Sequence, residues 1–194
     1  MIIWFTGLSG AGKSTICRAA EQEFRARGWR VEVLDGDEVR RHLSKDLGFS
    51  KQDRIENLHR IQYVSQLLAR NGILVLVAAI SPYHEIRDEI RRASTVPFLE
   101  VYVNAPLAVC EQRDPKGLYR KARQGLISHF TGISDPFEIP LAPDVVCHTD
   151  TEEIAESCAK VLASAEHLLR KSASRNENEG VDAILLSSSL RAAR

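Results

Sequence analysis

The residues best suited to chemistry stand near the start of the chain, in the stretch WFTGLSGAGKSTICRAA at 4–20. Its spacing fits the phosphate-binding pattern G-x-x-x-x-G-K-[ST], with an apolar segment before it and a helical pattern after it. Glycines let backbone N–H groups converge on an anion, and the helix adds its positive N-terminus. The nucleotide-contacting residues expected here are Gly7, Ser9, Gly10, Ala11, Gly12, Lys13, Ser14 and Thr15.

Two side chains of this loop are expected to act on the nucleotide phosphates. Lys13 would bridge β- and γ-phosphate oxygens, and the Ser14 hydroxyl would bind Mg²⁺. A nucleotide with Mg²⁺ is therefore expected here, and the resemblance described below implies ATP. A GTP-driven switch would need an N-K-x-D element and a strand ending in D-x-x-G, and the sequence has neither where the fold would need it. Switching is a minor alternative.

Two carboxylates follow the apolar segment VEVL at 31–34. Ligand groups gather at the carboxyl ends of strands in open α/β sheets, so Asp35 and Asp37 are expected beside the phosphate-binding loop. One carboxylate can bind Mg²⁺ through water while the other orients an acceptor hydroxyl. Asp35 is the candidate for the metal, together with Ser14, and also for orienting or deprotonating the hydroxyl. The alternative is an Asp-Gly turn with a helix N-cap.

Apolar runs of strand length alternate with helical patterns along most of the chain. Strands are expected at 2–5, 31–34, 73–79, 98–103 and 144–149, and helices after the phosphate-binding loop up to Gly28, at 51–71, at 84–94, from Pro106 and at 150–171. This alternation predicts an α/β protein of the P-loop NTPase or kinase fold, with a parallel sheet covered by helices on both faces.

Two parts of the chain depart from this alternation. Residues 113–143 are rich in Gly, Pro and basic side chains, which predicts a mobile lid more than a packed element. From 172 the sequence turns polar and Ser-rich. We therefore expect a kinase domain over 1–171 and a disordered C-terminal tail over 172–194, in which VDAILL could form a short helix.

Composition narrows the class of partner. The 26 basic and 26 acidic side chains balance, so nothing favours nucleic acid or a membrane surface, and a small molecule is the expected partner.

The four cysteines, Cys17, Cys110, Cys147 and Cys158, lie in apolar patterns without a C-x-x-C pair, which favours buried thiols in a reducing compartment. The start MIIWFTG is too short for a signal sequence, so we expect a soluble cytoplasmic protein.

Longer motifs resemble a known family. The segments GLSGAGKST, LDGDEVR, DLGFSKQDRIENLHR, ISPY, EVYVNAPLAVCEQRDPKGLYRKA and FTGISDPFEIP together resemble the adenylylsulfate kinases, over residues 2 to about 170. That resemblance implies transfer of the ATP γ-phosphoryl group to the 3′-hydroxyl of adenosine 5′-phosphosulfate, which gives 3′-phosphoadenylyl sulfate and ADP in sulfate assimilation. It leaves open a homodimer and an association with ATP sulfurylase.

The resemblance also implies an acceptor site. Phe49 and Phe130 match the family's two aromatics that sandwich the substrate adenine. The other residues implied to contact adenylylsulfate are Asp35, Asp37, Arg40, Arg54, Asn57, Ile80, Ser81 and Lys116. On the residues alone, each Phe could be core, and the arginines could be solvated helix surface.

Ser81 is often described in this family as a phosphoserine intermediate. We expect direct transfer instead, because two bound nucleotides need only positioning and charge neutralisation, and no general base is evident beside Ser81. The alternatives are another small-molecule kinase, for a nucleoside or a sugar acid, and a catalytically silent nucleotide-binding module. The intact set Lys13, Ser14, Asp35 and Asp37 argues against the silent module.

Overall fold

A computed structural model describes residues 1–191 of the chain. Its centre is a five-stranded sheet in the order β2-β3-β1-β4-β5, and every neighbouring pair is parallel. The strands are β1 (Ile2–Thr6), β2 (Val31–Asp35), β3 (Leu74–Ala78), β4 (Phe98–Asn104) and β5 (Val145–His148). All five lie where the sequence predicts them, within one or two residues.

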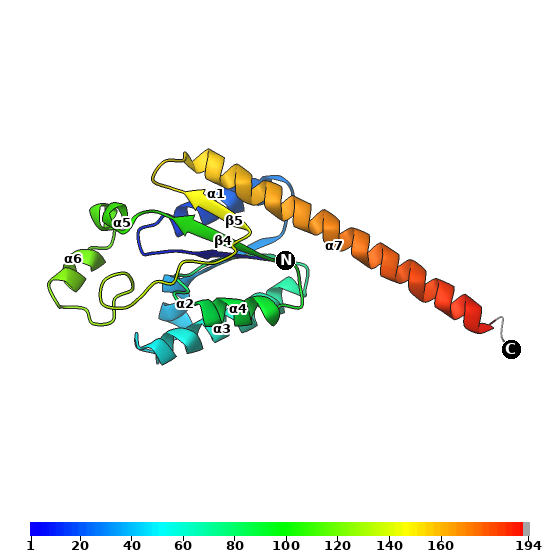
Figure 1. Ribbon diagram of the computed structural model, residues 1–194, viewed down its shortest axis with the longest axis horizontal. Coiled ribbons are helices and arrows are strands. Elements are labelled where there is room, and N and C mark those ends of the chain that lie inside the picture. Colours follow the sequence, from blue (N-terminus) through cyan, green and yellow to red (C-terminus); the bar gives the residue numbers. More distant parts are fainter. Residues whose placement is uncertain (192–194) are drawn as a thin grey trace.

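Helices cover both faces of this sheet (Figure 1). They are α1 (Lys13–Ala26), α2 (Gly36–His42), α3 (Lys51–Ala69), α4 (His84–Arg92), α5 (Leu107–Arg113), α6 (Leu118–Arg123) and α7 (Ile154–Arg191). The pair α1 and α7 pack together on one face, and α3 and α4 pack together on the other. The α/β class, with a parallel sheet between two helical layers, is confirmed.

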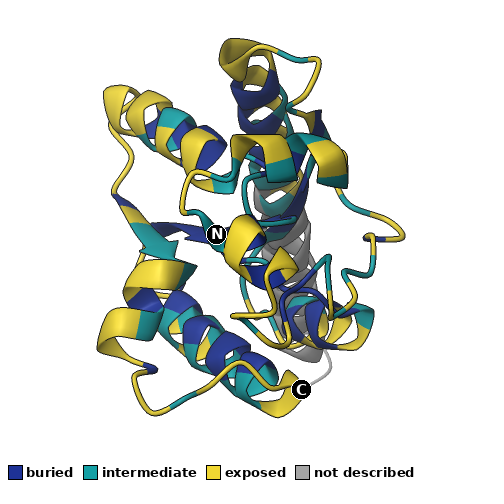
Figure 2. Ribbon diagram, turned by 90° about the vertical axis from the view of Figure 1, so that its left-hand side faces the viewer, coloured by how far each residue is buried: buried dark blue, intermediate teal, exposed yellow. Residues whose placement is uncertain are grey.

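The central strand β1 shows why both layers are needed. Successive side chains of a strand point to opposite faces, so Ile3 and Phe5 join the core beneath α1 and α7, while Ile2 and Trp4 join the core beneath α3 and α4. All four are essentially inaccessible to solvent. Figure 2 shows buried residues on the inner sides of the helices and exposed residues on their outer sides. A strand buried on both faces gives the continuous apolar run in the sequence.

The chemistry-bearing segments follow the carboxyl ends of the strands. The phosphate-binding loop follows β1, Asp35 ends β2, and Ser81 comes three residues after β3. In a parallel sheet these ends lie along one edge. The fold therefore brings together segments that the sequence separates by tens of residues.

Two short helices were not among the sequence predictions. In α2, the carboxylate of Asp35 accepts the Asp37 backbone N–H at 2.9 Å, so the N-cap considered as an alternative does form. In segment 113–143, α6 carries the buried Tyr119, and Phe130 follows it in the core. The prediction that this segment is not a packed element is therefore wrong for α6 and Phe130, because their apolar side chains bury against the domain. Its mobility stays a prediction.

The last helix is longer than predicted. The sequence pattern indicates an end near Lys171, whereas α7 continues to Arg191 and extends past the sheet (Figure 1). Residues 154–191 contain no proline, and their Ala, Glu, Leu and Arg content is compatible with a helix. The boundary at 171 and the disorder of the tail stay predictions, and residues 192–194 lie outside the described part.

All four cysteines are free and buried, as expected. Burial raises the pKa of Cys17 to about 12 and that of Cys147 to about 11, and it raises the pKa values of Cys110 and Cys158 as well. None of the helices within residues 1–191 combines the length and apolar character needed to cross a bilayer.

Candidate active site

A cavity of about 720 Å³ opens at the carboxyl edge of the sheet. It is lined by the phosphate-binding loop, the ends of β2 and β3, the start of α3, and parts of segment 113–143. Every side chain predicted to bind ATP or substrate lines it except Gly7 and Ala11. Gly7 has φ +150°, and a Cβ there would meet the Val103 carbonyl oxygen at 2.3 Å, while Ala11 is buried in the core. These two residues shape the loop through the backbone.

The phosphate-binding loop curls around its own lysine. Gly12 is the N-cap of α1 in the left-handed conformation, which directs the helix N-terminus at the cavity. Lys13 Nζ donates to the carbonyl oxygens of Gly7 at 2.9 Å and Leu8 at 2.7 Å. Burial, with the nearby charge of Lys116, lowers the pKa of Lys13 to about 8. A phosphate anion entering the loop would supply the charge partner that this ammonium group needs.

Ser14 and Asp35 form a pair of oxygen donors beside the loop. The Ser14 hydroxyl donates to Asp35 Oδ2 at 2.7 Å, and Asp35 Oδ1 caps α2. Hydroxyl and carboxylate oxygens suit Mg²⁺, which keeps several waters and takes further ligands from phosphates. No cluster of three or more His, Cys, Asp or Glu fit for a metal occurs in residues 1–191. A metal here would therefore be held jointly with the nucleotide.

Asp37 and Lys116 both line the cavity and contact each other. Their side chains form an ion pair that links α2 to segment 113–143. Both side chains are about half exposed to solvent, so the pair contributes little to stability and can open readily. The cavity thus has a polar contact between the main domain and the predicted lid.

The predicted aromatic residues line one end of the cavity. Phe49 is 56% exposed, whereas Phe130 is 8% exposed and packs edge-to-face on Tyr119 at 5.0 Å between ring centroids. The guanidinium groups of Arg40 and Arg54 lie 4.5 and 5.7 Å from the centre of the Phe49 ring. This end of the cavity combines an exposed aromatic face with concentrated positive charge.

Both arginines also hold the backbone in place. Arg40 donates to the Gly48 carbonyl oxygen at 2.8 Å. Arg54 donates to the Phe49 carbonyl oxygen at 3.0 Å and to that of His129. Because His129 precedes Phe130, one guanidinium fixes the backbone next to both aromatic rings. The two arginines are therefore only partly free to bind a ligand, which residue spacing alone did not reveal.

Two buried polar atoms have no hydrogen-bond partner and belong to residues that line the cavity. They are Oδ1 of Asn57, which the sequence predicts in the site, and Oγ1 of Thr131, which it does not. A buried polar group without a partner is costly. These atoms are candidates for contacts that a ligand or water completes.

The loop after β3 is tied to the strand that precedes the phosphate-binding loop. The Thr6 hydroxyl donates to the Ile80 carbonyl oxygen at 2.6 Å, and the Trp4 indole N–H donates to the Ser81 hydroxyl oxygen at 2.8 Å. Ser81 is buried and has φ +48°, a conformation that a non-glycine residue rarely adopts. Among the side chains that the structure describes, no carboxylate or imidazole hydrogen-bonds to its hydroxyl.

The opposite end of the cavity was missed by sequence reasoning. Arg113 donates to the Gly10 carbonyl oxygen at 3.3 Å and to that of Thr149 at 2.6 Å, and Thr149 Oγ1 donates to the Ala11 carbonyl oxygen at 2.6 Å. Arg113 and Thr149 line the cavity together with Glu152 and Ile154. The resemblance contained Arg113 within RDPKG, but no pattern in the sequence places it beside Gly10.

A phosphate-binding loop that shares one cavity with aromatic and basic side chains is the arrangement of a P-loop kinase of small molecules. A family model described as adenylylsulphate kinase matches residues 1–148, and the chain belongs to that family. It is 60% identical over 166 residues to the adenylyl-sulfate kinase of Gloeothece citriformis, covering 86% of this chain and 94% of that one. It is 62% identical over 159 residues to the probable adenylyl-sulfate kinase of Synechocystis, covering 82% and 89%. The solved structure of the Mycobacterium tuberculosis APS kinase, in complex with AMPPNP and APS, superposes with a TM-score of 0.81 at 46% identity, covering 85% and 96%.

Proposed function

We propose that this protein is an adenylylsulfate kinase, which transfers the γ-phosphoryl group of ATP to the 3′-hydroxyl of adenylylsulfate. The observation that carries the proposal is the continuity of one cavity from the phosphate-binding loop to Phe49 and Phe130. Two nucleotides can then meet with their reacting groups between the two ends. The membership of the family and the solved relative with AMPPNP and APS support the same reaction.

The acceptor would occupy the aromatic end. Its adenine would stack between Phe49 and Phe130, a contact worth ~1 to 3 kcal/mol per base in nucleic-acid binding. Its phosphosulfate would meet the guanidinium groups of Arg40 and Arg54, whose planar donors suit such oxygens. Asn57, Ile80, Ser81 and Lys116 line the same chamber and complete the proposed contacts.

The donor would occupy the other end. The triphosphate would lie in the loop 7–15, on the backbone N–H groups and the N-terminus of α1. Its base would then extend towards Arg113 and Thr149, because the aromatic end is taken by the acceptor. Lys13 would give up its contacts with two loop carbonyls to bind the β- and γ-phosphates.

Asp35 and Asp37 would have different roles in the reaction. Ser14 and Asp35 fit a Mg²⁺ ion, which when bound neutralises charge on the phosphates. Both oxygens of Asp35 already accept hydrogen bonds, from Ser14 and from the Asp37 N–H. We therefore assign the orientation of the acceptor 3′-hydroxyl to Asp37, whose partner Lys116 lies on segment 113–143. Transfer is direct, since Ser81 has no base to activate it.

Segment 113–143 would close over the bound nucleotides. The exposed Asp37–Lys116 pair can rearrange at little cost, and Phe130 brings part of the segment onto the acceptor adenine. Closure predicts that adenylylsulfate added with ADP protects this segment from proteases. A cleavage rate that adenylylsulfate leaves unchanged would contradict closure.

An acceptor panel tests the proposed reaction. ADP release would be measured with ATP and Mg²⁺ and with adenylylsulfate, shikimate, gluconate or a nucleoside as acceptor. We expect turnover with adenylylsulfate and none with the other three. Turnover with gluconate or a nucleoside alone would assign the protein to another branch of P-loop kinases. Nucleotide binding without turnover on any acceptor would favour a silent module.

A further inference from the structure

Arg87 is a buried arginine outside the cavity. It lies on α4, it is 5% exposed, and it does not line the cavity that holds the proposed site. Its guanidinium nevertheless donates to the Ser81 carbonyl oxygen at 2.6 Å and to the Glu138 carbonyl oxygen at 2.6 Å. One side chain therefore joins the loop that follows β3 to the C-terminal part of segment 113–143.

The contact with Ser81 holds an unusual backbone conformation. Ser81 has φ +48°, and such a residue keeps this conformation only where its surroundings determine it. The hydroxyl is fixed by Trp4, and the carbonyl is fixed by Arg87. The orientation of Ser81 towards the acceptor thus depends on a residue that the acceptor does not touch.

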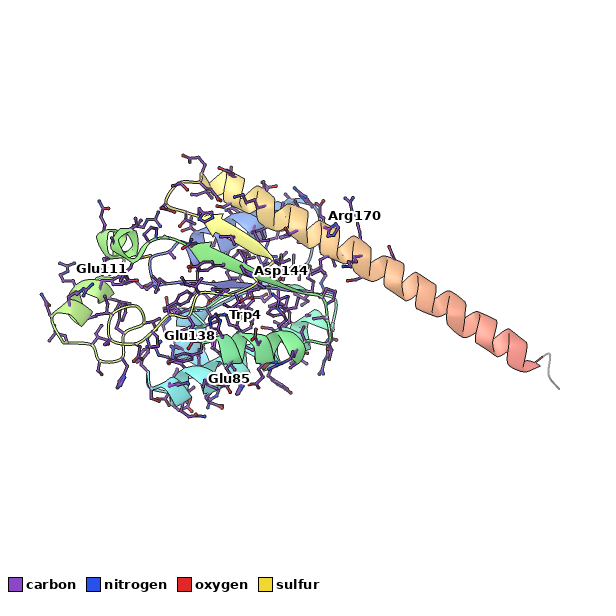
Figure 3. The ribbon with its side chains drawn as sticks, in the orientation of Figure 1. Trp4, Glu85, Glu111, Glu138, Asp144 and Arg170 are labelled. Atoms are coloured by element: carbon purple, nitrogen blue, oxygen red, sulfur yellow. The ribbon has the colours of Figure 1, made fainter. Side chains whose placement is uncertain are left out.

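The contact with Glu138 is part of a reciprocal set of bonds. The Glu138 N–H donates to the Pro82 carbonyl oxygen at 2.8 Å, and the Glu138 carboxylate accepts the His84 N–H at 2.5 Å. Arg87 also lies 2.9 Å from the His84 ring nitrogen Nδ1. Figure 3 labels Glu138 on the segment that leads into β5, and Trp4 on the central strand. The residues around Ser81 and the end of segment 113–143 are therefore bonded as one unit.

We propose that Arg87 is a positioning residue of the kinase reaction, which couples the Ser81 loop to the end of segment 113–143. Its guanidinium holds the acceptor-contacting loop and the anchor of the closing segment at a fixed separation. The role in acceptor binding rests on the proposed function, whereas the anchoring of segment 113–143 is independent of any substrate.

The chain contains a matched control in Arg91. Both arginines lie on α4 and pair with the buried Glu100: Arg87 Nε lies 3.2 Å from Oε1, and Arg91 Nη2 lies 3.3 Å from Oε2. Oε1 accepts no hydrogen bond, so the Arg87 contact is one of charge alone. Arg91 Nη2 also lies 2.7 Å from Asp144 Oδ2, and the described contacts of Arg91 do not include Ser81 or Glu138. Removing either arginine disturbs the charge around Glu100, but only Arg87 bonds to Ser81 and Glu138.

The test compares Arg87→Met with Arg91→Met in the full chain. We expect Arg87→Met to raise the KM for adenylylsulfate about tenfold or more, with a much smaller change in the KM for ATP. Arg87→Lys should recover part of this loss, since an ammonium group can reach one of the two carbonyls. Arg91→Met should leave both KM values near those of the wild type. Equal effects of the two variants, or equal effects on both substrates, would overturn the proposal.

A second measurement needs no substrate. Trypsin cleavage within segment 113–143 of the ligand-free protein should accelerate in Arg87→Met and not in Arg91→Met, because only Arg87 anchors Glu138. If Arg87→Met does not fold, the double variant Arg87→Met with Glu100→Gln removes the buried charge and serves in its place. Unchanged cleavage in a folded Arg87 variant would contradict the coupling. A wild-type protein without turnover on adenylylsulfate would instead contradict the proposed function and leave this result standing.

Discussion

The indole N–H of Trp4, in the middle of the central strand, donates a 2.8 Å hydrogen bond to the hydroxyl oxygen of Ser81. Both side chains are buried, and 77 positions of sequence separate them. The bond occupies one of the two lone pairs of the hydroxyl oxygen and fixes the orientation of the side chain. We therefore interpret Ser81 as a fixed contact for the acceptor and not as a carrier of the phosphoryl group.

Replacing Ser81 tests this interpretation. Ser81→Ala should keep kcat within about tenfold of the wild type, or roughly 1.4 kcal/mol of barrier, because the hydroxyl only positions the acceptor. Trp4→Phe removes the N–H but keeps an aromatic ring, and it should also keep kcat within about tenfold of the wild type. Abolished turnover in Ser81→Ala, or ³²P on Ser81 formed at the rate of catalysis, would establish a phosphoserine instead.

Lys13 is expected to serve the transition state more than the fold. Lys13→Ala should raise the barrier by ~2.7 to 4 kcal/mol, a loss typical for one deleted electrostatic stabiliser. The side chain bonds two loop carbonyls in the ligand-free protein, so a small loss of thermal stability is also expected. Steady-state kinetics and a melting curve measure the two effects. A near-normal kcat in the folded variant would rule out the assigned role of the loop.

The two phenylalanines should behave differently on truncation. Phe49 is 56% exposed, so Phe49→Ala should raise the KM for adenylylsulfate with little change in melting temperature. Phe130 is 8% exposed and packs on Tyr119, so Phe130→Ala should raise the same KM and also destabilise the fold. The KM for ATP is the control for both. If either variant affects ATP as strongly as adenylylsulfate, that ring does not belong to the acceptor site.

The lowered pKa of Glu152 predicts how the stability of the fold depends on pH. Burial is the largest influence on its pKa and by itself raises it, but hydrogen bonds from Lys160 and Ser157, at 2.6 and 2.7 Å, help to lower the pKa from 4.5 to about 2. A folded pKa below the unfolded value stabilises the protein above about pH 4.5, and this contribution is lost as the pH falls towards 2. Glu152→Gln should lower the melting temperature by a few degrees at neutral pH.

That deficit should shrink as the pH is lowered from 5 to about 2, as followed by melting curves of the two proteins. Glu153→Gln is the control, because it removes the same charge from an exposed neighbour. A deficit that is equal at all pH values, or one shared by the control, would show that the Glu152 carboxylate does not carry this stabilisation.

The fold could be predicted because its elements leave periodic patterns. The central strands are buried on both faces and appear as unbroken apolar runs, and α3 repeats apolar residues at helical spacing. Helices α2 and α6 have only seven and six residues, too few to show a period. The sequence pattern indicates an end of the last helix near Lys171, where the residues turn polar, but polarity does not itself end a helix, and α7 continues to Arg191.

The site could be predicted where a motif carries it. The spacing of one motif fixes Lys13 and Ser14, and the position of Asp35 at the carboxyl end of a strand places it beside them. Arg113 and Gly10 touch across 103 positions, and such a contact leaves no local trace. Phe130 packs in the core and also lines the cavity. The sequence around it cannot distinguish a residue with both positions from one that only packs in the core.

The reactivity of the four buried cysteine thiols can be used to measure local opening of the fold. A thiol reacts with an alkylating reagent only as the exposed thiolate, and the four cysteines are both inaccessible and raised in pKa. They lie on α1, α5, β5 and α7, so each samples a different element. Labelling each thiol over time would therefore report how readily that element opens, and nucleotides that tighten the domain should slow all four labelling rates.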